Sequence, residues 1–211
     1  LVRKASATAF GTHYNYKQIL KSEDLIQQFQ ASVPIFDYDS IHDEWWHRTL
    51  KEEANICWPG KIKYFALSSG TSGAPSKHIP ITTDLIRSHR RGSLRLVTSL
   101  PNYKVPTSLY SKGIMLLGGS TALEHKGGYY VGDLSGITAK QVPFWFRPFY
   151  KPGVKIAAEK DWESRITKIA ENARNWDIGI IGGIPSWIQL LMERIIEFHK
   201  VDTIHDIWPN L

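Results

Sequence analysis

The order of hydrophobic and polar residues along this chain predicts alternating strands and helices. Continuous apolar runs at 64–67, 113–119, 127–132 and 178–181 have the length of buried strands, and glycines flank or interrupt three of them. Between these runs lie longer segments in which apolar residues recur every three or four positions, as they do on one face of a helix. The aromatic segment 143–152 has neither period, so we expect a loop there.

The clearest helix is predicted from Asp161 to Asn175, because its apolar residues form one stripe: Trp162, Ile166, Ile169, Ala170 and Ala173. We expect this stripe to pack on a sheet. Further helices are expected in four places: a short one capped by Ser22 and ended by Val33-Pro34, one that begins at Asp43 and carries Trp45, Trp46, Leu50 and Ala54, one from Thr82 or Thr83 to about Ser99, and one from about Pro185 to His199.

The order of these elements indicates an α/β fold. Strand, crossover helix and strand in succession imply a mostly parallel sheet with helices on both faces, and such sheets bind ligands at the carboxyl ends of their strands. The loops after Leu67, Leu117 and Ile181 are therefore predicted to open at one edge and to form one site. The sequence contains no repeats and no linker that would divide it, so residues 1–211 are expected to form a single unit.

A loop rich in hydroxyl groups follows the strand at 64–67, and it reads Ser68-Ser69-Gly70-Thr71-Ser72-Gly73-Ala74-Pro75-Ser76-Lys77. Hydroxyls donate hydrogen bonds to anionic oxygens, glycines let the backbone approach a ligand, and the lysine supplies positive charge. Each charge-assisted hydrogen bond contributes roughly 1.5–3 kcal/mol. The residue types indicate a phosphate-binding loop, and an ordinary strand-to-helix connection is the alternative.

Three common motifs with glycine or lysine at fixed spacing are absent here. In a Walker A loop a glycine, a lysine and a hydroxyl residue follow one another, whereas three residues separate Gly73 from Lys77 here and His78 comes next. The chain also lacks the Gly-x-Gly-x-x-Gly pattern of dinucleotide-binding folds and the Gly-x-Ser-x-Gly elbow of α/β-hydrolases.

The loop does resemble the Ser/Thr/Gly-rich phosphate loop of adenylate-forming enzymes, the class of acyl-CoA synthetases and luciferases. Its two initial serines and its Lys77-His78-Ile79-Pro80 ending resemble one branch, the Gretchen Hagen (auxin-responsive promoter) family of acyl acid amido synthetases, in its bacterial type. Four other blocks extend the resemblance over nearly the whole chain: Val33–Tyr38, Asn55–Gly60, Gly132–Gly136 and Gly183–Trp187.

The resemblance implies a ligase that uses ATP and Mg²⁺ to adenylate a small carboxylic acid, and then transfers the acyl group to an amine, usually from an amino acid. It implies that Ser68, Ser69 and Thr71 hold the β- and γ-phosphates, that Gly70, Ser72 and Gly73 shape the loop, and that Lys77 is the catalytic residue that offsets charge on the departing pyrophosphate. The loops with Gly118 and Gly119 and with Ile184, Pro185 and Trp187 are expected to bind the acid. Trp187 has an alternative role as the anchor of its helix.

The family's Ser/Thr-Glu segment for adenine and magnesium, its ribose-binding aspartate and its carboxyl-terminal lid are absent from these 211 residues. We therefore expect an amino-terminal part of the adenylation domain that is inactive by itself. A synthetase with a thiol acceptor such as coenzyme A, and a non-catalytic protein that binds nucleotide or acid, stay open as alternatives.

Composition and charge bear on the other classes of protein that the chain could belong to. The net charge of +6 would attract polyanions, but the basic residues Arg87 to Arg95 fall on more than one helical face, which favours a solvated surface over a nucleic-acid groove. A single cysteine, Cys57, rules out an internal disulfide, and the eight histidines lack metal-ligand spacing. With no apolar run that could span a bilayer, we expect a cytoplasmic protein without membrane or nucleic-acid partners.

Overall fold

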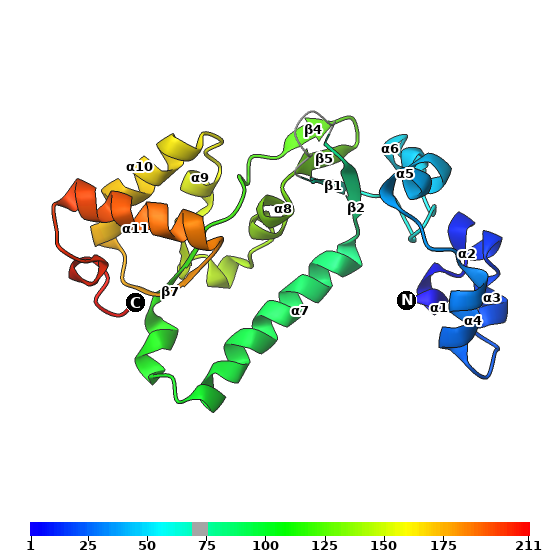
Figure 1. Ribbon diagram of the computed structural model, residues 1–211, viewed down its shortest axis with the longest axis horizontal. Coiled ribbons are helices and arrows are strands. Elements are labelled where there is room, and N and C mark those ends of the chain that lie inside the picture. Colours follow the sequence, from blue (N-terminus) through cyan, green and yellow to red (C-terminus); the bar gives the residue numbers. More distant parts are fainter. Residues whose placement is uncertain (69–75) are drawn as a thin grey trace. The chain divides into compact units, whose positions relative to one another are not determined.

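The computed structural model of the protein describes residues 1–68 and 76–211 (Figure 1). Contacts between residues group these into two compact units, which are described separately. Unit 1 comprises residues 1–65, 78–82 and 125–130, and unit 2 comprises residues 66–77, 83–124 and 131–211. The expectation that residues 1–211 form a single unit stays a prediction.

Unit 1 begins with short helices packed around aromatic side chains. The helices are α1 (Val2–Ala5), α2 (Ala9–His13), α3 (Tyr16–Ile19), α4 (Leu25–Ser32), α5 (Tyr38–Ile41), the π-helix η1 (His42–Trp46) and α6 (His47–Leu50). Their core contains Phe10, Tyr16, Ile19 and Trp45, and the rings of Phe10 and Trp45 are 5.0 Å apart. Edge-to-face aromatic pairs of this kind add to the stabilisation that burial provides.

Two predicted helix starts in unit 1 are wrong, because other side chains form the caps. The carboxylate of Asp24 accepts hydrogen bonds from the Ile26 and Gln27 amides, whereas the Ser22 hydroxyl donates to the Ile19 carbonyl at 2.6 Å. The helix expected from Asp43 starts at Tyr38 instead. There Asp37 and Ser40 form a capping box, and the helical segment continues through η1 to Leu50.

A four-stranded sheet has the order β2-β1-β5-β4, with β1 at Tyr64–Leu67, β2 at His78–Ile81, β4 at Glu124–Lys126 and β5 at Tyr129–Gly132. The strand predicted at 64–67 is confirmed, and the one predicted at 127–132 corresponds to β5. The sequence analysis missed β2 and β4. The three residues of β4 are all exposed, so they lack the apolar run on which the prediction depended.

Unit 2 contains the predicted parallel sheet. Its order is β6-β3-β7, with β3 at Gly113–Leu116, β6 at Tyr150–Lys151 and β7 at Ile178–Gly182, and β3 pairs in parallel with both neighbours. Its helices are α7 (Thr83–Ser99), α8 (Leu134–Lys140), α9 (Val154–Ala157), α10 (Trp162–Asn172) and α11 (Pro185–His199), and its 3₁₀ turns are η2 (Leu100–Tyr103), η3 (Thr107–Ser111), η4 (Phe144–Phe146), η5 (Ala173–Asn175) and η6 (Ile204–Asp206). The α/β class with helices flanking a parallel sheet is thus confirmed.

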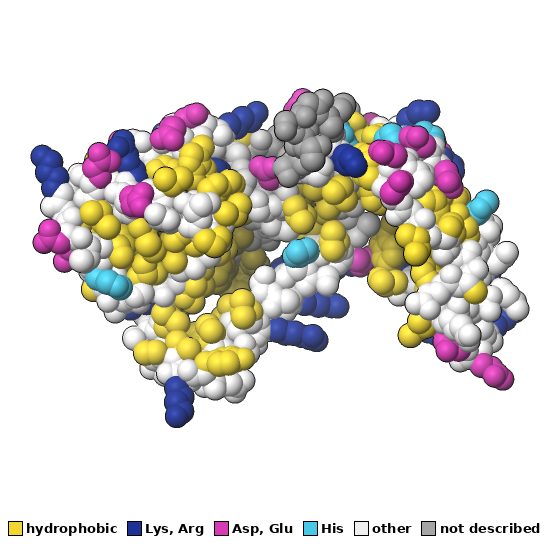
Figure 2. Space-filling model, viewed as in Figure 1, with side chains coloured by type: hydrophobic (Ala, Val, Ile, Leu, Met, Phe, Trp, Pro, Cys, Tyr) yellow, Lys and Arg dark blue, Asp and Glu magenta, His cyan; other side chains and the backbone are white. Residues whose placement is uncertain are grey.

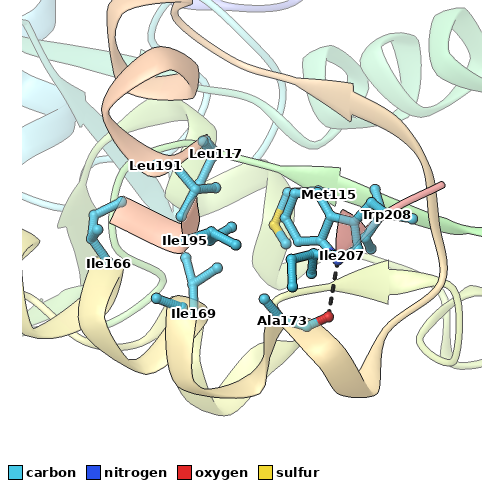
Figure 3. Close-up of a cluster of buried hydrophobic side chains, with 11 residues drawn as sticks. Met115, Leu117, Ile166, Ile169, Ala173, Leu191, Ile195, Ile207 and Trp208 are labelled. Atoms are coloured by element: carbon cyan, nitrogen blue, oxygen red, sulfur yellow. Dashed lines mark hydrogen bonds between the residues drawn. The ribbon is translucent and has the colours of Figure 1, made fainter. Parts of the chain in front are cut away.

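The core of unit 2 lies where α10 and α11 meet the sheet (Figure 3). Met115 of β3 and Leu117, the residue after the strand, belong to this core together with Ile169, Leu191 and Ile195. Trp208 closes the cluster and donates its indole N–H to the Ala173 carbonyl at 2.9 Å. The predicted apolar stripe of α10 does pack on the sheet, and Asp161 caps this helix through the Ser164 amide.

The remaining unit 2 predictions are mostly confirmed. Helices α7 and α11 run over the expected residues. The segment 143–152, expected to be a loop, contains η4 and the two-residue strand β6, which is too short to show a period. The loops after Leu117 and Ile181 follow neighbouring strands of one sheet, as predicted. Leu67 ends a strand of the other sheet, so the prediction of one edge for all three loops is wrong.

Candidate functional site

The predicted phosphate loop connects β1 to β2. Ser69, Gly70, Thr71, Ser72 and Gly73 lie outside the described residues, while Ser68 and Lys77 stand at the two ends of the loop. The Ser68 amide donates a hydrogen bond to the Lys77 carbonyl at 3.1 Å. This bond brings the two ends of the loop together, so the half-buried Ser68 and the exposed Lys77 lie on adjacent backbone positions.

The two strands that flank the loop, β1 and β2, are held in place by contacts with other parts of unit 1. Phe65 is completely buried, and its ring lies 4.8 Å from the ring of Tyr129. The backbone amide of His78 donates to the hydroxyl of Tyr38 at 2.9 Å. Both ends of the loop are therefore attached to fixed parts of the fold, which is what a loop needs in order to hold its donors toward a ligand.

Gly118 and Gly119 lie in the loop after β3, against the first turn of α8. The Gly119 amide donates to the Ser135 hydroxyl at 2.7 Å. A β-carbon at Gly119 would lie 2.1 Å from a carboxylate oxygen of Asp133, so no larger residue fits unless α8 moves. Close approach of the backbone is the reason for glycine here.

The loop after β7 adjoins this segment. The Leu117 amide donates to the Gly182 carbonyl at 2.8 Å, and a β-carbon at Gly183 would lie 2.8 Å from the Leu117 carbonyl oxygen. The two glycine pairs, Gly118-Gly119 and Gly182-Gly183, therefore meet at the carboxyl ends of two neighbouring parallel strands. This is the edge at which ligands bind in open α/β sheets.

These glycines line a cavity of about 1120 Å³ within unit 2. Its lining combines apolar side chains with basic ones, and Figure 2 shows basic side chains projecting from α7 beside hydrophobic surface. The apolar part comes from Ile86, Leu94, Val97, Leu116, Leu117, Ala139, Val142, Pro143, Trp145, Phe146, Tyr150, Pro152, Ala157 and Ile169, and the basic part from Arg87, His89, Arg90 and Arg165. Such a lining suits an apolar ligand with an anionic group.

The other predicted acid-binding residues lie outside the lining of this cavity. Ile184 precedes the first turn of α11 and Pro185 is its first residue, where a missing amide hydrogen costs nothing. The ring of Trp187 packs on Trp162 of α10, with 4.5 Å between the ring centres. The structure thus brings Gly118 and Gly119 to the cavity and Trp187 to the packing of α11 on α10.

The sequence analysis missed Arg165, which lines the cavity and is only 6% exposed. It sits one position before Ile166 in the apolar stripe of α10, three residues after Trp162 and four before Ile169. An arginine on the buried face of a helix was the available signal, because charged residues are rarely buried without a partner. Burial lowers the pKa of its guanidinium, and the charge of Asp133 acts in the opposite direction.

The described part of the chain contains neither a metal-binding cluster nor a membrane-spanning helix. Residues 1–68 and 76–211 contain no group of three or more His, Cys, Asp or Glu side chains that could hold a metal ion. None of the helices within those ranges is both long and apolar enough to cross a membrane.

Comparisons with known proteins identify the family of the chain and similar folds. The sequence matches the GH3 family N-terminal domain over residues 1–167. No curated protein sequence matches the chain. Two similar solved structures are described as the AtGH3.15 acyl acid amido synthetase in complex with 2,4-DB and as the GH3.15 acyl acid amido synthetase.

These two structures resemble the chain in fold. The first shares 19% identity with a TM-score of 0.67 over 94% of this chain, and the second shares 19% identity with a TM-score of 0.68 over 93%. At such identity the likeness concerns the fold. The chain spans about a third of the length of these structures, 34% in each case.

Proposed function

This chain belongs to the GH3 family, and from that premise we propose that the protein activates a carboxylic acid with ATP and transfers the acyl group to an amine, such as an amino acid. The observation that carries the proposal is the hydroxyl- and glycine-rich loop from Ser68 to Lys77, which lies inside the part of the chain that matches the family. The cavity beside Gly118 and Gly119, with its apolar and basic lining, supports an acid as the substrate.

In the proposed reaction, an oxygen of the substrate carboxylate attacks the α-phosphate of ATP, and pyrophosphate leaves. The amine then attacks the carbonyl carbon of the acyl-adenylate, AMP leaves, and the amine nitrogen loses a proton. The first step mainly requires that negative charge on the phosphates be neutralised and that the reactants be held in line. Residues that donate hydrogen bonds and carry positive charge are sufficient for that role.

We assign those roles to the loop. Ser68, Ser69 and Thr71 donate to the β- and γ-phosphate oxygens, Gly70, Ser72 and Gly73 allow the backbone to approach them, and Lys77 offsets the charge of pyrophosphate as it departs. The hydrogen bond from Ser68 to Lys77 fits this assignment, because it keeps a hydroxyl and an ammonium group on neighbouring backbone. Mg²⁺ would arrive with the nucleotide, and the roles proposed for this chain's residues do not depend on it.

We further propose that Gly118 and Gly119 form the floor of the acid site. Ile184, Pro185 and Trp187 would contribute through the position of α11, since the Trp187 ring packs on Trp162 and not in the cavity lining. ATP as a cosubstrate and Cys57 as the single cysteine support a cytoplasmic location. A thiol acceptor in place of the amine is the second candidate, because the roles assigned to the phosphate loop concern ATP and leave the acceptor open.

Acid-dependent exchange of labelled pyrophosphate into ATP by the full-length protein tests the proposal. Because each lost hydrogen bond to a phosphate costs about 1–3 kcal/mol, Ser69→Ala and Thr71→Ala should slow the exchange roughly ten- to a hundredfold, and Lys77→Ala at least as much. Lys63→Ala, which removes an exposed lysine just before β1, is the matched control and should exchange at the parent rate. Parent rates in all three loop variants would refute the phosphate role, and product analysis with amines and thiols identifies the acceptor.

A further inference from the structure

Arg165 is a buried cation without a partner of its own. Its side chain is 6% exposed, and its Nε is buried with no hydrogen-bond partner. Among the described residues its guanidinium takes part in no hydrogen bond or ion pair, and it forms a cation–π contact with Trp162, whose ring centre is 5.0 Å from Cζ. A guanidinium carries five N–H donors in a planar fork, so Arg165 has donors that no described residue accepts from.

The charged and polar groups around Arg165 do not neutralise it. Asp133, Tyr150 and Glu159 are the acidic groups that interact electrostatically with Arg165. Glu159 is bound to Lys168, and Tyr150 stays uncharged because burial raises its pKa. Asp133 is exposed and forms no ion pair with Arg165. Since an unpaired buried charge destabilises a fold, a cation retained here indicates a ligand that supplies the missing anion.

The cavity beside Arg165 fits one class of anion. Leu116, Val142, Phe146 and Ile169 provide apolar walls, and Gly119 lets the backbone come close. A carboxylate matches the guanidinium fork with two parallel hydrogen bonds and leaves an apolar body for these walls. Beside Arg165 itself the cavity lining is mainly apolar, and the nearby charge of Asp133 is negative, so this end of the cavity suits a single carboxylate better than a polyphosphate.

We propose that Arg165 binds the carboxylate of an organic acid in this cavity. The inference rests on the proposed synthetase reaction for its biological meaning, since both the acid that is adenylated and an amino acid acceptor carry a carboxylate. The chemistry of the site is the same for either source. Binding of the carboxylate to Arg165 does not itself require adenylation, so the two proposals can fail separately.

The test is to measure the binding of carboxylates and their amides to the full-length protein by isothermal titration calorimetry. Octanoate and phenylacetate are compared with their uncharged amides, octanamide and phenylacetamide. The parent protein should bind at least one carboxylate about tenfold or more tightly than its amide, as expected for hydrogen bonds to a charged group. Arg165→Met should abolish that preference and Arg165→Lys should retain part of it. Arg174→Met, which removes an exposed arginine outside the cavity lining, should bind as the parent does.

Thermal unfolding separates this role from a structural one. If the charge of Arg165 is unpaired when no ligand is bound, Arg165→Met should raise the melting temperature of the free protein by about 2–4 °C, because the substitution removes a buried charge. A carboxylate preference that persists in Arg165→Met, or a parent protein that prefers neither carboxylate over its amide, overturns the proposal. If Arg165→Met loses both the preference and stability, Arg165→Lys decides: restored preference supports the proposal and its absence overturns it.

Pyrophosphate exchange then identifies the source of the carboxylate. If the adenylated acid binds to Arg165, the Arg165→Lys variant should show a raised KM for that acid in an exchange assay that contains no amine. If the acceptor binds there, exchange should be unchanged and the KM for the amino acid should rise in amide formation. Carboxylate preference without any pyrophosphate exchange would retain Arg165 as a carboxylate site and reject the proposed synthetase reaction.

Discussion

Cys57 shows how burial controls the chemistry of a single residue. Burial raises the pKa of its thiol from 9.0 to about 11, and the hydrogen bond with Trp46 and the charge of Arg48 only partly oppose this shift. The thiolate is the reactive form, so at pH 8 the folded protein should react with Ellman's reagent roughly a hundredfold more slowly than the unfolded protein. Absorbance of the released thionitrobenzoate measures both rates, and equal rates would contradict the raised pKa.

The same shift makes stability depend on pH in a defined direction. The folded protein keeps the Cys57 proton that the unfolded chain loses above about pH 9, so this contribution to the unfolding free energy is complete below pH 9 and is lost as the pH rises to about 11. Cys57→Ala should lack this component. Urea unfolding of both proteins between pH 8 and 11 measures this component together with its coupling to Tyr16, because burial and then the charge of Cys57 raise the pKa of Tyr16. The raised pKa of Tyr14, caused mainly by burial, is common to both proteins.

At the scale of elements, the placement of α8 depends on glycine at one point of contact. Gly136 lies against the loop after β3, and a β-carbon there would be 2.1 Å from the Ser120 carbonyl oxygen. Gly136→Ala should therefore displace α8 and destabilise the protein by about 1–3 kcal/mol. Gly92 in α7 is the matched control, since its β-carbon would meet nothing within 4 Å.

Gly92→Ala should have the opposite effect and stabilise the protein by about 0.5–1 kcal/mol, because alanine loses less backbone entropy than glycine in a helix. Urea unfolding followed by circular dichroism measures both variants. Destabilisation of equal size at the two positions would mean that helix propensity and local packing do not account for the difference between them.

The elements that could be predicted from the sequence are those whose own residues carry a strong period. Helices α10 and α11 and strand β1 meet that condition, and each was found close to its observed bounds. Strand β6 has two residues and β4 has three exposed ones, so only pairing with distant segments makes them strands. The caps of α4 and α5 were misassigned because several polar side chains could form them, and the choice between Ser22 and Asp24 depends on where the preceding helix ends.

The candidate site was predictable to the extent that its chemistry is local. The phosphate loop is contiguous in sequence, so its residue types alone indicated a ligand. The assembly of Gly118-Gly119 with Gly182-Gly183 followed from the expected parallel strands. Arg165 was missed because its importance comes from what surrounds it: burial, the ring of Trp162 and the absence of a paired carboxylate are properties of the fold.

At the scale of the whole molecule, residues 1–68 and 76–211 contain two separate hydrophobic cores. One contains Ile19 and Phe10 and belongs to unit 1, and the other contains Ile195 and Met115 and belongs to unit 2. Cores that belong to separate compact units can lose structure independently, which departs from two-state unfolding. The sequence, in contrast, predicts a single unit, because no linker interrupts it. If the chain has two independent cores, a loss of packing in one core leaves the other folded. If the chain is a single unit, the same loss destabilises all of it.

Truncation of one buried isoleucine in each core distinguishes them. Ile19 and Ile195 are 1% and 0% exposed, so Ile19→Ala and Ile195→Ala should each cost about 2–5 kcal/mol in their own core. If the cores open separately, amide hydrogen exchange measured by mass spectrometry should accelerate in peptides from residues 1–65 for Ile19→Ala and in peptides from residues 131–211 for Ile195→Ala, with the other region unchanged. Acceleration throughout the chain in both variants would instead show one cooperative unit, because a single unfolding equilibrium would then expose every amide together.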